Sequence, residues 1–187
     1  MEVEDYLNSS TPLYFVRFEY RQNDYVFINN GSNLGHKWAD LFRDISALIF
    51  VVDINMYFQR NSQTGQNLLL EQMQIFDATI NSDFASRLPI ILLLNKYDQF
   101  KVNVHRYPLH SYFPDFKLPK DRTEQTEDDV REYISKRFKA LNRNEKQGKR
   151  MVYPFAVHII DEDVVKKLID TITAILQKEE LRKIGFK

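Results

Sequence analysis

The chain has 187 residues and carries 26 basic and 26 acidic side chains, so its formal net charge is zero. This length suits one domain with its own core, and the balanced charge excludes a strong electrostatic pull toward nucleic acid or an anionic membrane. The absence of cysteine excludes disulfides, thiolate metal sites and a catalytic thiol.

Apolar runs in the first part of the chain predict a hairpin, a helix and a strand, in that order. The hairpin strands are expected over residues 14–20 and 25–28, on either side of a turn at residues 22–24. A short amphipathic helix follows over residues 36–43. The continuous apolar run from Ala47 to Asp53 then predicts a buried strand.

The alternation of helices and strands continues to the end of the chain. The expected elements are a helix over 66–80, a strand from Pro89 to Leu94, a loop-rich stretch over 100–122, a helix that begins after Thr126, a polar connection over 142–150, a strand from Val152 to Ile160, and a last helix that Asp161 caps and that ends near Gly185. The predicted buried face of that last helix is Val165, Leu168, Ile169, Ile172 and Leu176. This order predicts an α/β fold with a mostly parallel sheet, helices on both faces and one antiparallel edge strand.

Isolated charged and ionisable residues are expected to have ordinary structural roles. The basic stretches Lys136-Arg137 and Lys146 to Arg150 indicate solvated helix and loop surface. The histidines (His36, His105, His110 and His158) lack metal-ligand spacing and are expected to have surface or core roles. The start of the chain is acidic, without an apolar signal core, and the apolar runs are too short to span a bilayer, so we expect a cytoplasmic protein without a transmembrane segment.

The most informative motif is Asn95-Lys96-Tyr97-Asp98, which follows the apolar run over residues 90–94 directly. A buried parallel strand delivers such polar residues to its carboxyl end, where ligands bind in open α/β sheets. The Asp98 carboxylate can accept hydrogen bonds from both the N1–H and the exocyclic amino group of guanine, a donor pair that adenine lacks. The Lys96 stem can lie along the flat base, and Asn95 can brace the loop. The alternative is that Asn and Asp bond only to nearby backbone, as they often do after strands.

The flanking sequence extends this motif to a family. Residues from about 6 to 187 resemble the C-terminal half of the Ras-like domain of heterotrimeric G-protein α subunits. The resemblance rests on Lys37-Trp38 with Phe42, on the helix from Leu69 to Asn81, on Asn95 to Phe100, on Tyr112-Phe113-Pro114, and on the tail from Leu181 to Phe186. It implies a three-layer Ras-like fold of the P-loop GTPase class, present as one partial domain over residues 1–187, with the first strand and the phosphate loop missing.

The resemblance also implies ligands, partners and residue roles. The cofactors would be GTP or GDP and Mg²⁺, and the partners a βγ dimer, a G-protein-coupled receptor and an effector enzyme, with no nucleic acid. It assigns guanine binding to Asn95, Lys96 and Asp98, γ-phosphate sensing to Gly31, a magnesium ligand to Ser9, the βγ- and effector-facing surface to Lys37 and Trp38, and the receptor-facing tail to Leu181, Gly185 and Phe186. The backbone of Val157 to Ile160 corresponds to the last base-contact loop of the family. Partners would bring the protein to the inner face of the plasma membrane.

The phosphate chemistry of the family has no match in this chain. None of the five glycines belongs to a Gly-x4-Gly-Lys-Ser/Thr phosphate loop. Asp5 stands where the family keeps the arginine that neutralises transition-state charge, and Ser32 or Asn33 stands where it keeps the glutamine that orients water. The sequence therefore names no catalytic residue.

Three interpretations follow from these matches and departures. The first is a GTP-binding α subunit that transmits receptor signals. The second is a nucleotide-independent pseudo-GTPase module, or a truncated product that competes for receptor, βγ or effector. The third is an incomplete gene model of a full subunit. The missing first strand further predicts an exposed sheet edge through which the chain self-associates or binds a partner.

Overall fold

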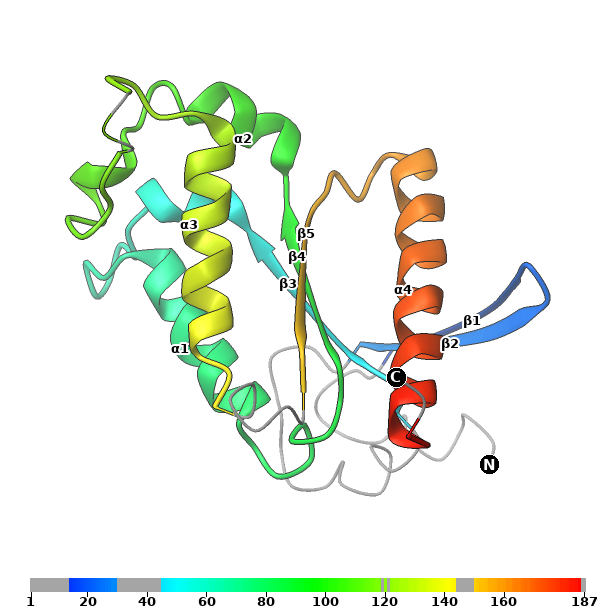
Figure 1. The fold of residues 1–187 in the computed structure, drawn as a ribbon. Coiled ribbons are helices and arrows are strands. Elements are labelled where there is room, and N and C mark those ends of the chain that lie inside the picture. Colours follow the sequence, from blue (N-terminus) through cyan, green and yellow to red (C-terminus); the bar gives the residue numbers. More distant parts are fainter. Residues whose placement is uncertain (1–13, 30–44, 119, 121, 144–149, 186–187) are drawn as a thin grey trace. The chain divides into compact units, whose positions relative to one another are not determined.

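The computed structural model describes residues 14–29, 45–118, 120, 122–143 and 150–185 (Figure 1). The chain divides into two units, residues 1–44 and residues 45–187. The expected helix over residues 36–43 lies outside the described residues.

The described part of the first unit is an antiparallel hairpin of β1 (Tyr14–Tyr20) and β2 (Asn23–Asn29). Strand β1 has the expected bounds, whereas β2 begins two residues earlier than expected, because the two-residue loop consists of Arg21 and Gln22. Both loop residues have positive φ, 47° and 63°, the sign that matches the twist of a two-residue hairpin. The hairpin predicted from the apolar pattern is therefore present, with its turn shifted.

The second unit contains a parallel sheet in the order β3 (Leu48–Asp53), β4 (Ile90–Asn95) and β5 (Val152–Ala156). Asp53 lies opposite Asn95, and Leu94 lies opposite Ala156. The prediction that the last strand reaches Ile160 was wrong, because Leu94 is the last residue of β4 that pairs with β5. The sheet and the hairpin together give the mixed α/β fold, with parallel strands and an antiparallel pair, that the sequence predicts.

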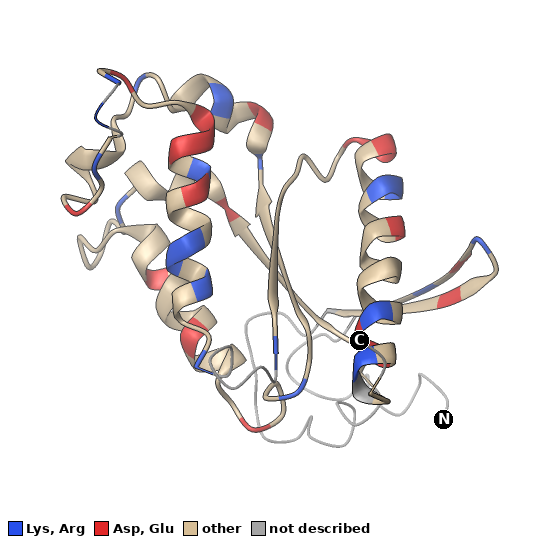
Figure 2. Ribbon diagram, in the orientation of Figure 1, with Lys and Arg blue, Asp and Glu red and all other residues tan. Residues whose placement is uncertain are grey.

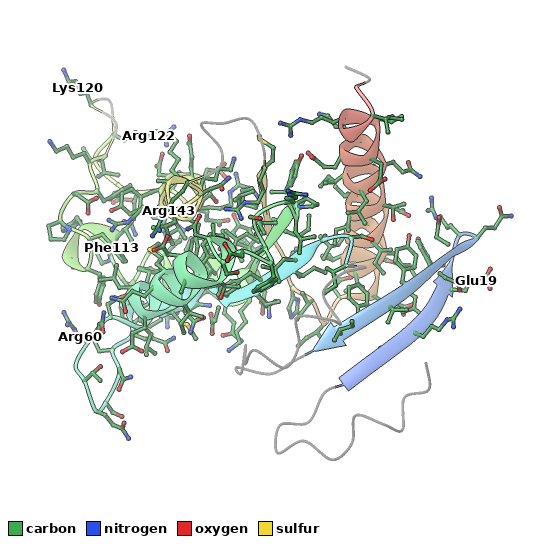
Figure 3. All side chains as sticks on the ribbon, turned by 90° about the horizontal axis from the view of Figure 1, so that it is seen from below. Glu19, Arg60, Phe113, Lys120, Arg122 and Arg143 are labelled. Carbon is green, nitrogen blue, oxygen red and sulfur yellow. The ribbon has the colours of Figure 1, made fainter. Side chains whose placement is uncertain are left out.

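Helices cover both faces of this sheet (Figure 1). One face carries α1 (Leu68–Ile80), α3 (Glu127–Ala140) and α2 (Tyr97–Asn103), with the short 3₁₀ helices η4 (Ile54–Phe58) and η5 (Leu109–Ser111); the other face carries α4 (Glu162–Lys183). Strand β4 divides its side chains between two apolar cores, with Ile90, Leu92 and Leu94 facing the first and Ile91 and Leu93 the second. Figure 3 shows how side chains fill the space between the sheet and its helices.

Local sequence signals account for most helix boundaries. Asn67 caps α1, and the Thr126 hydroxyl and Asp129 carboxylate form a reciprocal capping box at α3. Asp161 caps α4, and Gly185 follows its end with a φ of 85°, as predicted. Acidic side chains lie in the first turn of α3 and basic ones in its last turn, the arrangement that the helix dipole favours (Figure 2).

Two sequence expectations were wrong in detail, and a third was incomplete. The stretch over 100–122 is loop-rich as expected, but it also contains the end of α2 and all of η5. On α4, the partly buried Val164 and Ile175 pack against the core around Ile172, whereas the expected Val165 and Ile169 do not belong to that core. Arg150 was assigned to solvated surface but is 1% exposed.

The two edges of the parallel sheet differ in their exposed backbone. On β5, the Met151 carbonyl and the Val157 N–H face β4. Since peptide groups alternate along a strand, Pro154 faces outward. Pro154 has no N–H, so that edge lacks a donor at its centre. On β3, the Leu48 N–H faces β4, so the peptide group of Val51 faces outward, and the described residues supply β3 with a partner on one side only.

Within the described residues, no helix is both long enough and apolar enough to cross a membrane.

Candidate functional site

The carboxyl ends of the three parallel strands meet at one edge of the sheet. Strand β3 ends at Asp53, directly opposite Asn95 at the end of β4. Beyond β5, the Val157 N–H donates to the Leu94 carbonyl at 2.9 Å, and the Tyr97 N–H donates to the Val157 carbonyl at 3.2 Å. These bonds hold the loop after β5 against the junction of β4 and α2. Ligands bind at such an edge in open α/β sheets.

Asn95 fastens the same loop with its side chain. Its Oδ1 accepts a hydrogen bond from the Ile159 N–H at 3.2 Å. The loop from Val157 to Ile160, which the sequence places at the base-contact position, thus lies beside the motif. Asn95 therefore braces the loop, as the sequence predicts.

Lys96 has an unusual backbone and a fixed side chain. It lies in the left-handed region, with φ of 59°, where residues other than glycine are uncommon. Its Nζ lies 2.8 Å from Asp53 Oδ2, and its side chain remains 49% exposed. The hydrogen bond from Lys96 to the Asp53 carboxylate raises the pKa of the lysine. The lysine is thus charged and held in one direction, with half of its surface open to a ligand.

Asp98 lies in the first turn of α2, two residues after Lys96, and has a different environment. Its carboxylate is 43% exposed, so it remains accessible to a hydrogen-bond donor. The His158 Nε2 lies 3.8 Å from Asp98 Oδ1 and comes from the loop after β5. The acidic side chain near the start of a helix is also favoured by the helix dipole.

Together, Asn95, Lys96 and Asp98 present one bracing amide, one exposed lysine stem and one accessible carboxylate at a single edge. This set has the chemistry needed to read a flat base that carries two adjacent N–H donors. The motif lines neither of two shallow grooves along α3; the larger, of about 390 Å³, is lined mainly by Asp128, Arg131 and Glu132. The guanine role of the motif therefore stays a prediction that rests on donor and acceptor geometry.

Some of the other predicted site residues belong to the described part of the chain, and others lie outside it. Ser9, Gly31, Lys37, Trp38 and Phe186 lie outside the described residues. Within the described ranges, no group of three or more His, Asp or Glu side chains could hold a metal ion, so the assignment of Mg²⁺ to Ser9 stays a prediction. In the predicted tail, Leu181 is 51% exposed and Gly185 ends the helix.

Three residues at this edge were missed by the sequence analysis. Asp53 and Asn55 follow β3 as Asn95 follows β4, so the same pattern of an apolar strand ending in polar residues could have identified them. His158 was given only a surface or core role, although it lies in the loop already assigned to base contact. Nothing in the local sequence indicates its approach to Asp98, because that contact joins residues sixty positions apart.

Comparison with known proteins gives the same family throughout. A family model described as "G-protein alpha subunit" matches residues 2–176. The chain is 28% identical over 179 residues to the guanine nucleotide-binding protein alpha-3 subunit of Caenorhabditis elegans, covering 94% of this chain and 48% of that protein. It is 27% identical over 188 residues to an alpha-3 subunit of Neurospora crassa, covering 99% of this chain and 50% of that protein.

A yeast relative covers a smaller part. The chain is 30% identical over 150 residues to the alpha-1 subunit of Saccharomyces cerevisiae, which covers 80% of this chain and 30% of that protein. The chain thus spans about half the length of the first two relatives and less of the third.

Proposed function

Because the chain belongs to the G-protein alpha subunit family, we propose that it is a guanine-nucleotide-binding signal transducer whose base site is Asn95, Lys96 and Asp98. The observation that carries this proposal is the accessible Asp98 carboxylate beside the Lys96 stem, at the edge where three parallel strands end. Guanine offers its N1–H and its amino group to one carboxylate, and the lysine stem covers the flat face of the base.

We extend the proposal to the ligands and partners of the family. GTP or GDP would supply the base, with Mg²⁺ on Ser9 and the γ-phosphate near Gly31. A βγ dimer and an effector would meet Lys37 and Trp38, and a G-protein-coupled receptor would meet Leu181, Gly185 and Phe186. These partners would hold the protein in the cytoplasm and at the inner face of the plasma membrane. The receptor assignment is supported by Leu181 and Ile184, two large apolar side chains that are both more than half exposed at the end of α4.

The proposal is tested by titrating the purified chain with GDP, IDP and ADP and measuring heat or fluorescence. IDP lacks the 2-amino group and keeps N1–H, so it should bind roughly tenfold or more weakly than GDP, since one bond to a charged acceptor is lost. ADP offers neither donor and should not bind. Asp98→Asn should weaken GDP binding by at least about a hundredfold, because both bonds lose the carboxylate.

The matched control is Asp83→Asn, which neutralises an exposed carboxylate in the connection between α1 and β4, at the opposite end of the parallel sheet. It should leave GDP binding unchanged. Equal binding of GDP and ADP, or equal losses in both variants, would contradict the proposal. No binding of any nucleotide would favour the alternative of a nucleotide-independent interaction module.

We propose that the outer edge of β3 is the surface through which such a module, or the transducer itself, self-associates. The edge is apolar, with Val51 48% exposed, and the described residues pair it on one side only. Val51→Lys should lower the apparent mass in analytical ultracentrifugation, while Val102→Lys, an equally exposed position on α2, should not. A wild-type chain that sediments as a monomer at all concentrations would refute this part.

A further inference from the structure

Asp53 lies at the end of β3 with its carboxylate 15% exposed, and it makes two kinds of contact at once. Its Oδ2 is paired with the Lys96 ammonium at 2.8 Å. Its Oδ1 accepts from both the backbone N–H and the side-chain amide of Asn55, at 2.9 Å and 3.0 Å. One oxygen therefore holds a lysine, and the other holds an asparagine.

Asn55 carries the second contact on to the backbone of the same lysine. It is 2% exposed, and its side-chain amide also donates to the Lys96 carbonyl at 3.3 Å. Its own Oδ1 accepts from Asn103 Nδ2 at 3.0 Å, which ties the group to the end of α2. Asp53 thus reaches both ends of Lys96, the ammonium directly and the carbonyl through Asn55.

These contacts hold Lys96 in an unfavourable backbone conformation. A non-glycine residue with φ of 59° costs free energy and persists only where its surroundings hold it. Lys96 is also the residue immediately before α2. Its backbone conformation therefore sets the direction of the chain between the end of β4 and Asp98. Contacts that fix Lys96 therefore fix the separation of the lysine stem and the Asp98 carboxylate.

We propose that Asp53 is a positioning residue of the guanine site, which lays the Lys96 stem along the base position before the base arrives. The inference rests on the proposed function of Asn95, Lys96 and Asp98 and adds a residue from another strand to it. A free lysine side chain loses rotamer freedom when it packs against a ligand, and that cost lowers affinity. Anchoring the ammonium beforehand removes part of the cost, while the stem, which makes the contact, stays exposed.

Asp53→Asn tests the proposal with little disturbance of the fold. The amide oxygen can still accept from the Asn55 N–H and cap η4, but the amide nitrogen cannot pair with an ammonium. Asp77→Asn is the matched control: Asp77 also forms a 2.8 Å ion pair, with Arg143, and also accepts from an asparagine side chain, Asn81, but it lies on α1. Asp53→Glu restores the carboxylate on a longer stem.

Two measurements on the full chain separate this inference from the proposed function. The first follows the Lys96 side-chain resonance by NMR against pH. Asp53→Asn should lower the pH at which Lys96 titrates, Asp53→Glu should restore most of the shift, and Asp77→Asn should leave it unchanged. Identical Lys96 titration in the wild type and Asp53→Asn would overturn the proposal whether or not nucleotide binds.

The second measurement is GDP affinity at fixed salt, with thermal unfolding of each variant recorded alongside. Asp53→Asn should weaken GDP binding by about threefold to tenfold, as expected for a half-exposed ion pair to a charged group. Asp53→Glu should recover part of the affinity, and Asp77→Asn should have no effect. If Asp53→Asn binds GDP as tightly as the control, Asp53 has no positioning role; if no variant binds GDP, the proposed function fails while the NMR result still decides whether Asp53 anchors Lys96.

Discussion

Opposite ends of the parallel sheet each carry a cluster of polar residues built around one basic side chain. At the carboxyl end, Lys96 is half exposed and meets a single carboxylate. At the amino end, Arg150 just precedes β5 and is fully buried. Its guanidinium donates to the Ile80 and Ala85 carbonyls and to Asn142 Oδ1.

The two clusters differ in exposure, so we expect the buried one to contribute to stability and the exposed one to ligand binding. Burial lowers the pKa of the Arg150 guanidinium, but neutral oxygen atoms accept its hydrogen bonds. These bonds link the ends of α1 and α3 to the start of β5. The cluster around Lys96 instead leaves a stem and a carboxylate exposed to water. A saturated buried cluster has nothing left to offer a ligand, whereas an exposed one does.

The strongest test of this distinction is Arg150→Met. The loss of the guanidinium leaves two buried carbonyls and the Asn142 side chain without their donor, which should cost about 3–5 kcal/mol of unfolding free energy. Denaturant unfolding measures this loss. GDP affinity of the folded fraction should stay within about twofold, because the site lies at the other end of the sheet.

The control for this variant is Arg143→Met. Arg143, labelled in Figure 3, forms an ion pair with Asp77, but its side chain is 71% exposed. The change should therefore cost less than about 1 kcal/mol. Equal losses for the two arginines would mean that burial does not distinguish them.

Tyr153→Phe gives an intermediate case, a single hydrogen bond that links β5 to α4. The Tyr153 hydroxyl donates to Glu179 Oε1 at 2.6 Å, and Glu179 is 9% exposed. Loss of this bond should cost about 1 kcal/mol in denaturant unfolding. GDP affinity should not change.

The same bond gives this region a pH dependence. Burial, followed by the hydrogen bond to Glu179, raises the pKa of Tyr153 to about 12. A folded pKa above the unfolded value near 10 gives stability that is complete below about pH 10 and is lost as the pH rises toward 12. Tyr153→Phe should reduce the alkaline loss of stability between these values. An unchanged alkaline unfolding profile would show that other tyrosines control it.

The smallest expected effect belongs to His158→Ala. The imidazole lies 3.8 Å from the Asp98 carboxylate, and both side chains are about two-fifths exposed, 39% and 43%. An exposed pair of this kind is worth less than about 1 kcal/mol, so its removal should tighten GDP binding by about fivefold at most. His105→Ala, another exposed histidine, should have no effect. Weaker binding in His158→Ala would instead indicate that the imidazole contacts the base.

Sequence patterns predicted the strands and most helices because burial and periodicity are local signals. A few neighbouring residues are enough to predict each of three features: the buried strand before Asn95, the helix cap at Thr126 and the helix end near Gly185. The extra helix α2 was missed because the polar motif that starts it is also typical of a loop. Arg150 was misassigned because its burial depends on carbonyls of residues 65 and 70 positions away.

The candidate site could be predicted from the sequence only where its residues are neighbours in the chain. Asn95, Lys96 and Asp98 form one contiguous motif, so their meeting at the sheet edge follows from chain geometry alone. Asp53 and His158 reach the motif from β3 and from the loop after β5, so their contacts depend on strand order and register. Composition and periodicity do not contain that information.

Pro154 limits how large an assembly built by strand addition can become. The β5 edge lacks a central donor because of this proline, which leaves β3 as the edge better suited to strand addition. Two copies that join through β3 with two-fold symmetry use up the one permissive edge of each sheet. If the proposed association takes this form, growth ends at a closed dimer, because a third strand would have to pair at the edge where Pro154 offers no N–H.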